Sequence, residues 1–324
     1  MASGLTHILL TKKLQDKFED GKLKNILAFA ADSFQVGAVG PDLPYASIAD
    51  DDFFLSNESP LADDFHYKLT NQIPLQSLRK LKSLKGQIGE ELHYHMFSFF
   101  LGYISHVFAD GIIHPFVRDK VGEYIENQAE HRSLEMQIDV LFFEEFTKNS
   151  GFASELNYTN IHDEISNFLE LEYNNEIVKT FGDLIEAIYV QKYSEEKILG
   201  WVKGLHRMFE VAEGDHPWFY RNLKVNSFTF RNRADIDRDR AVVLQKPKDR
   251  DENFLKVREI DFFKDCIPQY YHRFVPVAQK AYNYVFEEGQ ELNETDIPLI
   301  NLDTGRLLPA NNLDIIPEFW NNNN

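Results

Sequence analysis

The spacing of apolar and polar residues along most of the chain matches an α-helix better than a β-strand. Residues 1–30 predict two short amphipathic helices with lysine-rich polar faces, and residues 70–83 predict another. A long apolar pattern over residues 88–110 predicts a central helix with one buried stripe. Further helices are predicted in the second half of the chain, at residues 161–173, 176–193, 194–209 and 260–287. The pattern therefore predicts an all-α protein.

Segments rich in glycine, proline and charge separate these helices. Residues 32–45 predict a constrained Gly-Pro turn with Asp42 at its tip, and residues 48–65 predict an acidic, aromatic flap. Residues 226–253 are dense in charge and predict a solvated loop. Residues 292–320 contain many turn residues and predict an extended segment that wraps the core.

With 324 residues, of which 43% are apolar, the chain is long enough to bury a large core. No internal repeat and no low-complexity linker divides it, so one compact, mainly helical unit is expected. Within that unit we expect a helical core over residues 1–225 and an irregular C-terminal extension over residues 226–324 that packs on this core.

The charge and the cysteine content exclude several classes of protein. A formal net charge of −18 argues against passive binding to nucleic acid or to an anionic membrane, because phosphate groups require a basic surface. Cys266 is the only cysteine, so an internal disulfide framework is excluded. The first residues lack the basic segment of a signal peptide, and no apolar run reaches the roughly eighteen residues of a membrane span. We therefore expect a cytoplasmic protein without a transmembrane segment.

Two of the predicted helices carry metal-type ligands on their apolar faces. On the first, His106 and Asp110 are four residues apart, so their side chains point the same way, one turn above each other. His114 follows directly before Pro115, where this helix is expected to stop or turn.

The second of these helices is expected to begin near Gln128 and to place His131 and Glu135 on one face, again four residues apart. Three imidazoles and two carboxylates then come from two facing helices and the turn after the first. Zinc binds nitrogen and oxygen ligands of this kind, and catalytic zinc sites keep an open position. Two such pairs so close together favour a metal site. The alternative is a helical core whose polar residues are hydrogen-bonded.

Several motifs occur in an order that is typical of one family. They are Thr6-His7, the segment GAVGPDLPY that ends at Tyr45, His66, GYISHVFADGIIHP (Gly102–Pro115) and HRSLEMQID (His131–Asp139). The last two are the most specific. With these motifs the chain resembles the zinc-dependent phospholipase C family, whose all-helical fold is shared with the S1/P1-type nucleases. The resemblance extends to about residue 140 and implies a multi-helix phospholipase C/P1 nuclease-like bundle.

The resemblance also implies a set of metal ligands. Two zinc sites would consist of His66, His106 and Asp110 in one, and His114, His131 and Glu135 in the other. Asp110 would bridge to the neighbouring ion. His7 would help to hold a third ion, and Asp42 would lie beside the attacking water as a ligand or general base. Two zinc ions (Zn2+) are thus expected, and a third is left open.

In function, the resemblance implies hydrolysis of a phosphodiester, in a phospholipid or a small molecule, by a metal-activated water. Tyr45, Phe65 and Tyr67 would line the substrate groove or else pack in the core. A nuclease of the same fold is one alternative, but the net charge and the lack of a basic strip beside aromatic residues count against nucleic acid. A non-catalytic scaffold stabilised by metal is the other. Metal content and a panel of substrates distinguish these three possibilities.

Four neighbouring residues are expected to lie outside the metal site. Thr6 is expected to cap the first helix. On the central helix His93 is expected at the surface or in contact with a partner, opposite His106, and His95 is expected in the core or beside a metal ligand. Asp139 is expected to orient a ligand rather than to bind metal.

Overall fold

The structure is a computed structural model that describes residues 4–14, 17–18, 21–49, 58–149, 161–213, 255, 260–289 and 291–321. Within these ranges all regular elements are helices, apart from an isolated β-bridge between Ile300 and Leu307. The α-helices are α1 (Gly4–Leu14), α2 (Lys22–Phe29), α3 (Ala31–Ala38), α4 (Ser59–Tyr67), α5 (Gln72–Leu84), α6 (Glu90–Val121), α7 (Gln128–Asn149), α8 (Ile161–Glu170), α9 (Asn174–Tyr189), α10 (Glu195–Glu213) and α12 (Ile267–Phe286). Shorter elements are the 3-10 helices η2 (Gly40–Ala49), η7 (Glu294–Asp296) and η8 (Glu318–Trp320), and the π-helix η6 (Phe262–Cys266). The predicted all-α class is confirmed.

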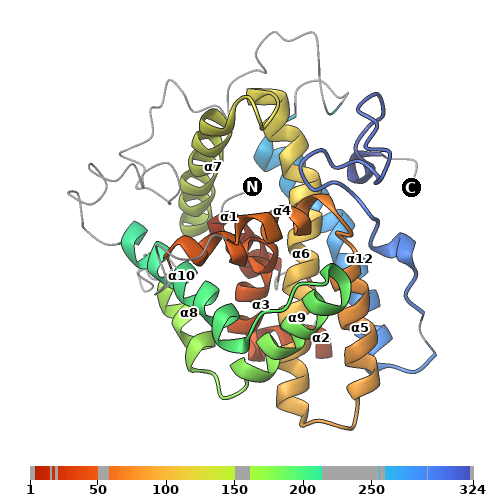
Figure 1. Cartoon of the computed structure of the whole chain (residues 1–324). Coiled ribbons are helices and arrows are strands. Elements are labelled where there is room, and N and C mark those ends of the chain that lie inside the picture. Colours follow the sequence, from red (N-terminus) through yellow and green to blue (C-terminus); the bar gives the residue numbers. More distant parts are fainter. Residues whose placement is uncertain are drawn as a thin grey trace.

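Helix α6 runs through the centre of the molecule, and other helices pack around it (Figure 1). Its neighbours include α3, α5, α7 and α12. By length and composition an 18-residue window of α6 could cross a membrane, yet all of this window is buried inside the fold. A helix that is apolar all round is buried, and α6 is the core helix of this bundle. Polar residues within this buried window therefore lie in the interior and need partners there.

The sequence predicted a stop at Pro115, but α6 continues through this residue for another turn and a half. Pro115 has no N–H group, so the carbonyl of Gly111 loses its helical donor. Gly305 packs against this point in a left-handed conformation (φ +66°), and a Cβ there would lie 2.6 Å from the Gly111 oxygen. The close fit of the C-terminal segment thus accommodates the proline within the helix. Because the helix continues, His114 stays on α6.

Two glycines let α3 and α6 approach each other closely. A Cβ on Gly37 would lie 2.0 Å from the carbonyl oxygen of Phe99, and a Cβ on Gly102 would lie 2.3 Å from that of Phe34. Only glycine fits at both positions. This contact fixes the end of α3 against the middle of α6, and it brings the following η2, with Asp42 in its first turn, to the same region.

Helix α4 forms the last part, residues 59–65, of the flap that was predicted over residues 48–65, of which residues 50–57 lie outside the described residues. Its apolar residues Leu61, Ala62 and Phe65 are buried, so tertiary packing overrides the acidic composition of the segment. The predicted helices at residues 1–30, and those that correspond to α5, α7 to α10 and α12, are present.

The C-terminal segment wraps the helical core as predicted. The Leu302 amide donates to the carbonyl of His66 on α4 (3.0 Å), and the Trp320 indole donates to the carbonyl of Ile112 on α6 (3.1 Å). In Figure 1 this segment, in blue, lies beside α6 and α12. The boundary predicted at residue 225 and the loop at residues 226–253 lie outside the described residues.

Candidate metal centre

Helix α6 places three candidate ligands on successive turns. The Nε2 atom of His106 lies 3.1 Å from Oδ2 of Asp110, and the Nε2 atom of His114 lies 3.5 Å from Oδ1 of the same carboxylate. All three side chains are buried. The two oxygens of Asp110 therefore face different histidines, which is the arrangement of a bridging carboxylate.

Two more histidines approach Asp110 from other helices. The Nε2 atom of His7, on α1, lies 3.2 Å from Oδ1, and the Nε2 atom of His66, on α4, lies 3.4 Å from Oδ2. Both rings are buried. Four imidazoles thus surround one buried carboxylate, two at each oxygen.

Asp42 reaches the centre from the side of η2. Its Oδ1 atom lies 3.3 Å from Nε2 of His66, and its side chain is 11% exposed, whereas that of Asp110 is fully buried. Asp42 is therefore the carboxylate of this pair that is nearer to solvent.

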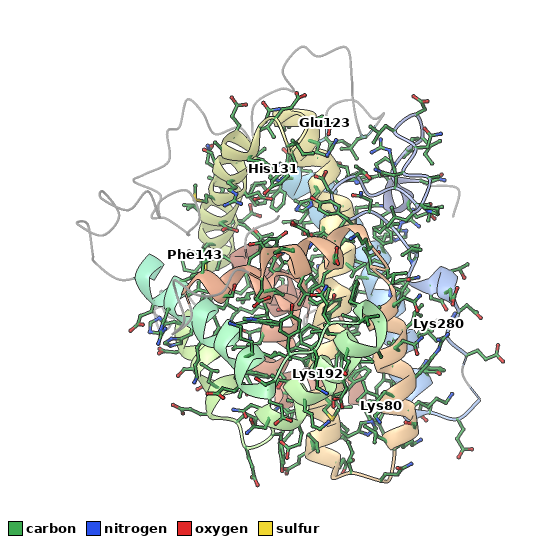
Figure 2. All side chains as sticks on the ribbon, in the orientation of Figure 1. Lys80, Glu123, His131, Phe143, Lys192 and Lys280 are labelled. Atoms are coloured by element: carbon green, nitrogen blue, oxygen red, sulfur yellow. The ribbon has the colours of Figure 1, made fainter. Side chains whose placement is uncertain are left out.

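Helix α7 supplies the other side of the centre. Oε1 of Glu135 lies 2.9 Å from Nε2 of His131 and 3.5 Å from Nε2 of His114. Figure 2 shows His131 on α7 close to the turn that joins it to α6. Within the described residues the structure forms three groups whose ligand atoms lie within 4.8 Å of one another: His7, His106 and Asp110; Asp42, His66 and His106; and His114, His131 and Glu135.

Backbone carbonyls orient two of the rings. The Nδ1 atom of His106 lies 2.8 Å from the carbonyl oxygen of Ala38, and the Nδ1 atom of His66 lies 2.7 Å from that of Ala62. A carbonyl can only accept, so Nδ1 carries the proton in both rings. In the neutral ring Nε2 then offers its lone pair to the centre, as in metal sites where the second ring nitrogen donates to a carbonyl.

The polar atoms at the middle of the centre lack the partners that buried polar atoms normally have. In the part of the chain that the structure describes, both oxygens of Asp110, both ring nitrogens of His7 and Oδ1 of Asp42 are buried without a hydrogen bond. Their short contacts do not have hydrogen-bond geometry. Nitrogen and oxygen atoms that converge in this way fit a bound cation, and the mixture of imidazole and carboxylate suits zinc.

The pKa shifts of the buried groups also indicate that the carboxylates of this centre favour positive charge beside them. Burial alone would raise the pKa of the Asp110 carboxyl, but the imidazoles of His106 and His114 hold that pKa well below its usual range. Burial lowers the pKa of His7, and the adjacent His106 lowers it further. Burial would also lower the pKa of His66, whereas the neighbouring carboxylates raise it to about 10. A proton on His66 therefore balances charge that a metal ion could balance instead.

Comparison with known families identifies this arrangement. A family model described as zinc dependent phospholipase C matches residues 6–203, more than half of the chain. The chain belongs to this family. All candidate ligands from His7 to Glu135 lie inside the matched region. Comparison with curated proteins and with solved structures gives no match.

Membership in the zinc-dependent phospholipase C family and the three ligand groups together support a metal-dependent, phospholipase-like function. The region after residue 203 lies outside the family match. It nevertheless contacts the centre, because Leu302 bonds to the backbone of His66.

Asp139 ties α7 to the start of α1. Its Oδ1 atom accepts hydrogen bonds from the Thr6 amide (3.0 Å) and the Thr6 hydroxyl (2.6 Å). The prediction that Thr6 caps the helix is wrong, because Thr6 lies inside α1 and its own free amide is capped by Asp139. Since His7 follows Thr6, this bond fixes His7 relative to the ligands on α7.

The three aromatic residues predicted for the substrate groove divide into two classes. The ring of Tyr45 lies 6.0 Å from that of His66, and the ring of Tyr67 lies 6.4 Å from it; both tyrosines are partly exposed. Tyr45 also donates to Asp63 (2.5 Å). Phe65 does not fit the groove, because it is fully buried and packs against core aromatic rings.

The two nearby histidines on α6 both lie in the core. His93 was predicted at the surface, but it is buried and its Nε2 atom bonds to the carbonyl of Leu81 (3.0 Å). His95 is buried as predicted, with Nδ1 at 2.8 Å from the hydroxyl of Ser33. Neither ring is in the three ligand groups.

Arg118 was missed in the sequence. It lies one turn after His114 on the stripe that carries the ligands, is buried, and pairs with Asp303 and Glu123. Its four-residue spacing from His114 was the available signal. Its partner Asp303 was not predictable from local pattern, because that contact joins distant parts of the chain.

Proposed function

We propose that this protein is a zinc-dependent hydrolase that cleaves the phosphodiester bond of a phospholipid by attack of water. The observation that carries this proposal is the carboxylate of Asp110, buried without a hydrogen bond to any described residue and placed with one oxygen toward each of two pairs of histidines. Support for the lipid class comes from the family match and from the net charge of −18, which disfavours polyanionic nucleic acid.

Two sets of residues would hold two ions. His106 belongs to two of the three ligand groups, but a neutral imidazole offers Nε2 to one ion only. This leaves two sets, namely His66 and His106 with Oδ2 of Asp110, and His114, His131 and Glu135 with Oδ1 of Asp110. His7 faces Oδ1 as well and is the residue around which a third ion would bind.

Zinc at these positions would lower the pKa of a bound water to about 7 and stabilise charge on the phosphate oxygens. Asp42 is the more exposed of the two carboxylates beside His66, and its Oδ1 atom has no hydrogen-bond partner in the described chain. We assign to Asp42 the acceptance of a proton from the attacking water. Tyr45 and Tyr67 flank His66 and would contact the substrate.

The test is hydrolysis of a short-chain phospholipid kept below its micellar concentration, with zinc-loaded protein. The proposal predicts release of the phosphorylated headgroup, loss of this activity on removal of zinc by a chelator, and much slower cleavage of single-stranded DNA. Release of fatty acid instead of headgroup, or faster cleavage of DNA, would overturn it.

A further inference from the structure

Hydrophobic side chains are exposed on a short loop of the C-terminal segment. Nine large hydrophobic residues are exposed in the described part of the chain, and four of them fall within residues 307–316. These four, the apolar loop residues, are Leu307, Leu313, Ile315 and Ile316. Exposed apolar residues gathered in one short loop favour an interaction surface.

A buried arginine braces the loop from inside. The guanidinium of Arg306 donates to the carbonyls of Thr304 (2.8 Å), Ile315 (2.9 Å) and Leu313 (3.4 Å). Arg306 itself is fully buried. The guanidinium therefore fixes the backbone of the loop at Leu313 and Ile315, whose side chains are 38% and 46% exposed.

The residues that precede this loop contact the helices that carry the metal ligands. Leu302 bonds to the backbone of His66, and Asp303 pairs with Arg118, which lies one turn after His114 on α6. The chain passes from these contacts into Arg306 and the loop within a few residues. The loop is thus attached to α4, which carries His66, and to α6, which carries His114.

A further exposed apolar residue, Ile125, is linked to Arg118 through the turn between α6 and α7. Arg118 also pairs with Glu123, in the turn between α6 and α7 that Figure 2 shows near the C-terminal segment. Two residues further on, Ile125 is 86% exposed. The intervening Tyr124 places its ring 5.0 Å from that of His131. The turn between α6 and α7 therefore also lies beside the metal centre.

The charge of the loop restricts its partner. Between residues 307 and 321 the only charged residues are Asp314 and Glu318, and no lysine or arginine is present. An anionic membrane would be repelled by this segment and by the net charge of −18. A zwitterionic lipid surface can accept aliphatic side chains without requiring positive charge.

We propose that the apolar loop residues, together with Ile125, dock the protein onto a zwitterionic phospholipid surface and so hold the metal centre at the headgroup layer. This inference rests on the proposed function, because it assigns to that same centre a substrate met at an interface. The expected occupant is lipid, since the surface adjoins the centre that would act on lipid.

The test is cosedimentation of the zinc-loaded full chain with phosphatidylcholine vesicles. In the triple variant Leu313→Ser, Ile315→Ser, Ile316→Ser the partition coefficient should fall roughly tenfold or more, because three aliphatic side chains no longer leave water. Hydrolysis of the monomeric short-chain phospholipid should not change. Phe29→Ser is the matched control: Phe29 is 53% exposed and packs beside Tyr94, near the opposite end of α6, so its vesicle binding should equal that of the parent.

Equal vesicle binding by the parent and the triple variant would overturn the proposal. So would a parent that ignores vesicles but dimerises through the loop, as shown by a mass that halves in the triple variant. If the triple variant is unstable, vesicle binding by the Ile125→Ser variant is an independent test, and this binding should be weaker than that of the parent. A parent that binds vesicles through the loop and hydrolyses no phosphodiester would refute the proposed function while leaving the docking surface intact.

Discussion

The imidazole rings of His7 and His106 are stacked, with centroids 3.9 Å apart and planes at 12°, although they come from the first and the sixth α-helix. Their Nε2 atoms face different oxygens of Asp110, at 3.2 and 3.1 Å. Two stacked imidazolium ions would repel each other, and accordingly burial and His106 lower the pKa of His7. The pair thus directs one nitrogen to each oxygen of a single carboxylate.

The stack leads to a prediction for His7→Phe, which keeps an aromatic ring against His106 but removes both nitrogens. Zinc content at saturation should remain at two ions per chain, because the two ligand sets proposed above do not include His7. His93→Phe is the control, since His93 is a buried histidine outside those groups. Loss of either of the two ions in His7→Phe alone, measured by elemental analysis, would refute the proposed division of ligands.

Asp42→Asn separates proton transfer from metal binding. The amide keeps the shape of the side chain and one oxygen, but it cannot accept a proton at neutral pH. If Asp42 is the general base, kcat should fall by about 10²–10⁴-fold while two zinc ions remain bound. Zinc analysis and phospholipid hydrolysis on one preparation decide the matter. A loss of zinc in the Asp42→Asn variant would show that Asp42 is a metal ligand. This result would contradict its role as the general base.

Local sequence pattern predicted the ligand pairs but not what surrounds them. The spacing of His106 and Asp110 needs only helical geometry, so it was visible in the sequence. Local rules predict a stop at Pro115, whereas α6 passes through it and packs there against Gly305, which lies far along the chain. His93 was predicted at the surface because it lies opposite His106 on the helix, but the neighbouring helix α5 covers it and supplies its partner, the carbonyl of Leu81. The errors arise where a distant segment supplies a contact.

Thr6→Val tests the bond between α1 and α7. Valine matches the shape of threonine but removes the hydroxyl that donates to Asp139, so this buried carboxylate loses a donor. We expect a loss of about 1–3 kcal/mol in the free energy of unfolding. Thr11→Val is the matched control, because Thr11 is buried on the same helix and its hydroxyl donates to the nearby carbonyl of Ile8. Urea denaturation should show the larger loss for Thr6→Val, and an equal or smaller loss would refute the bracing role of Asp139.

Removal of metal should make stability depend on pH through His66. The pKa of His66 is raised to about 10 in the metal-free fold, against about 6.5 in the unfolded chain. A raised pKa contributes stability that is fully present below pH 6.5 and is lost as the pH rises to about 10. Chelator-treated protein should therefore lose stability across this range.

His66→Gln should lack this component, so its metal-free stability should change less over the same pH range. Zinc would replace the proton on His66, so the affinity for zinc should rise with pH in the parent. Denaturation at a series of pH values tests both statements. Parallel profiles for the parent and His66→Gln would show that His66 carries no such proton.

The central claim is that Asp110 bridges two zinc ions, and zinc content by elemental analysis tests it most directly. The parent protein, offered zinc and then freed of excess, should hold at least two ions per chain. Asp110→Asn keeps the shape of the side chain but lowers the charge shared by both sites, and it should hold fewer ions and lose hydrolysis with them. An Asp110→Asn variant with the full zinc content of the parent, or a parent that binds no zinc, would contradict the claim.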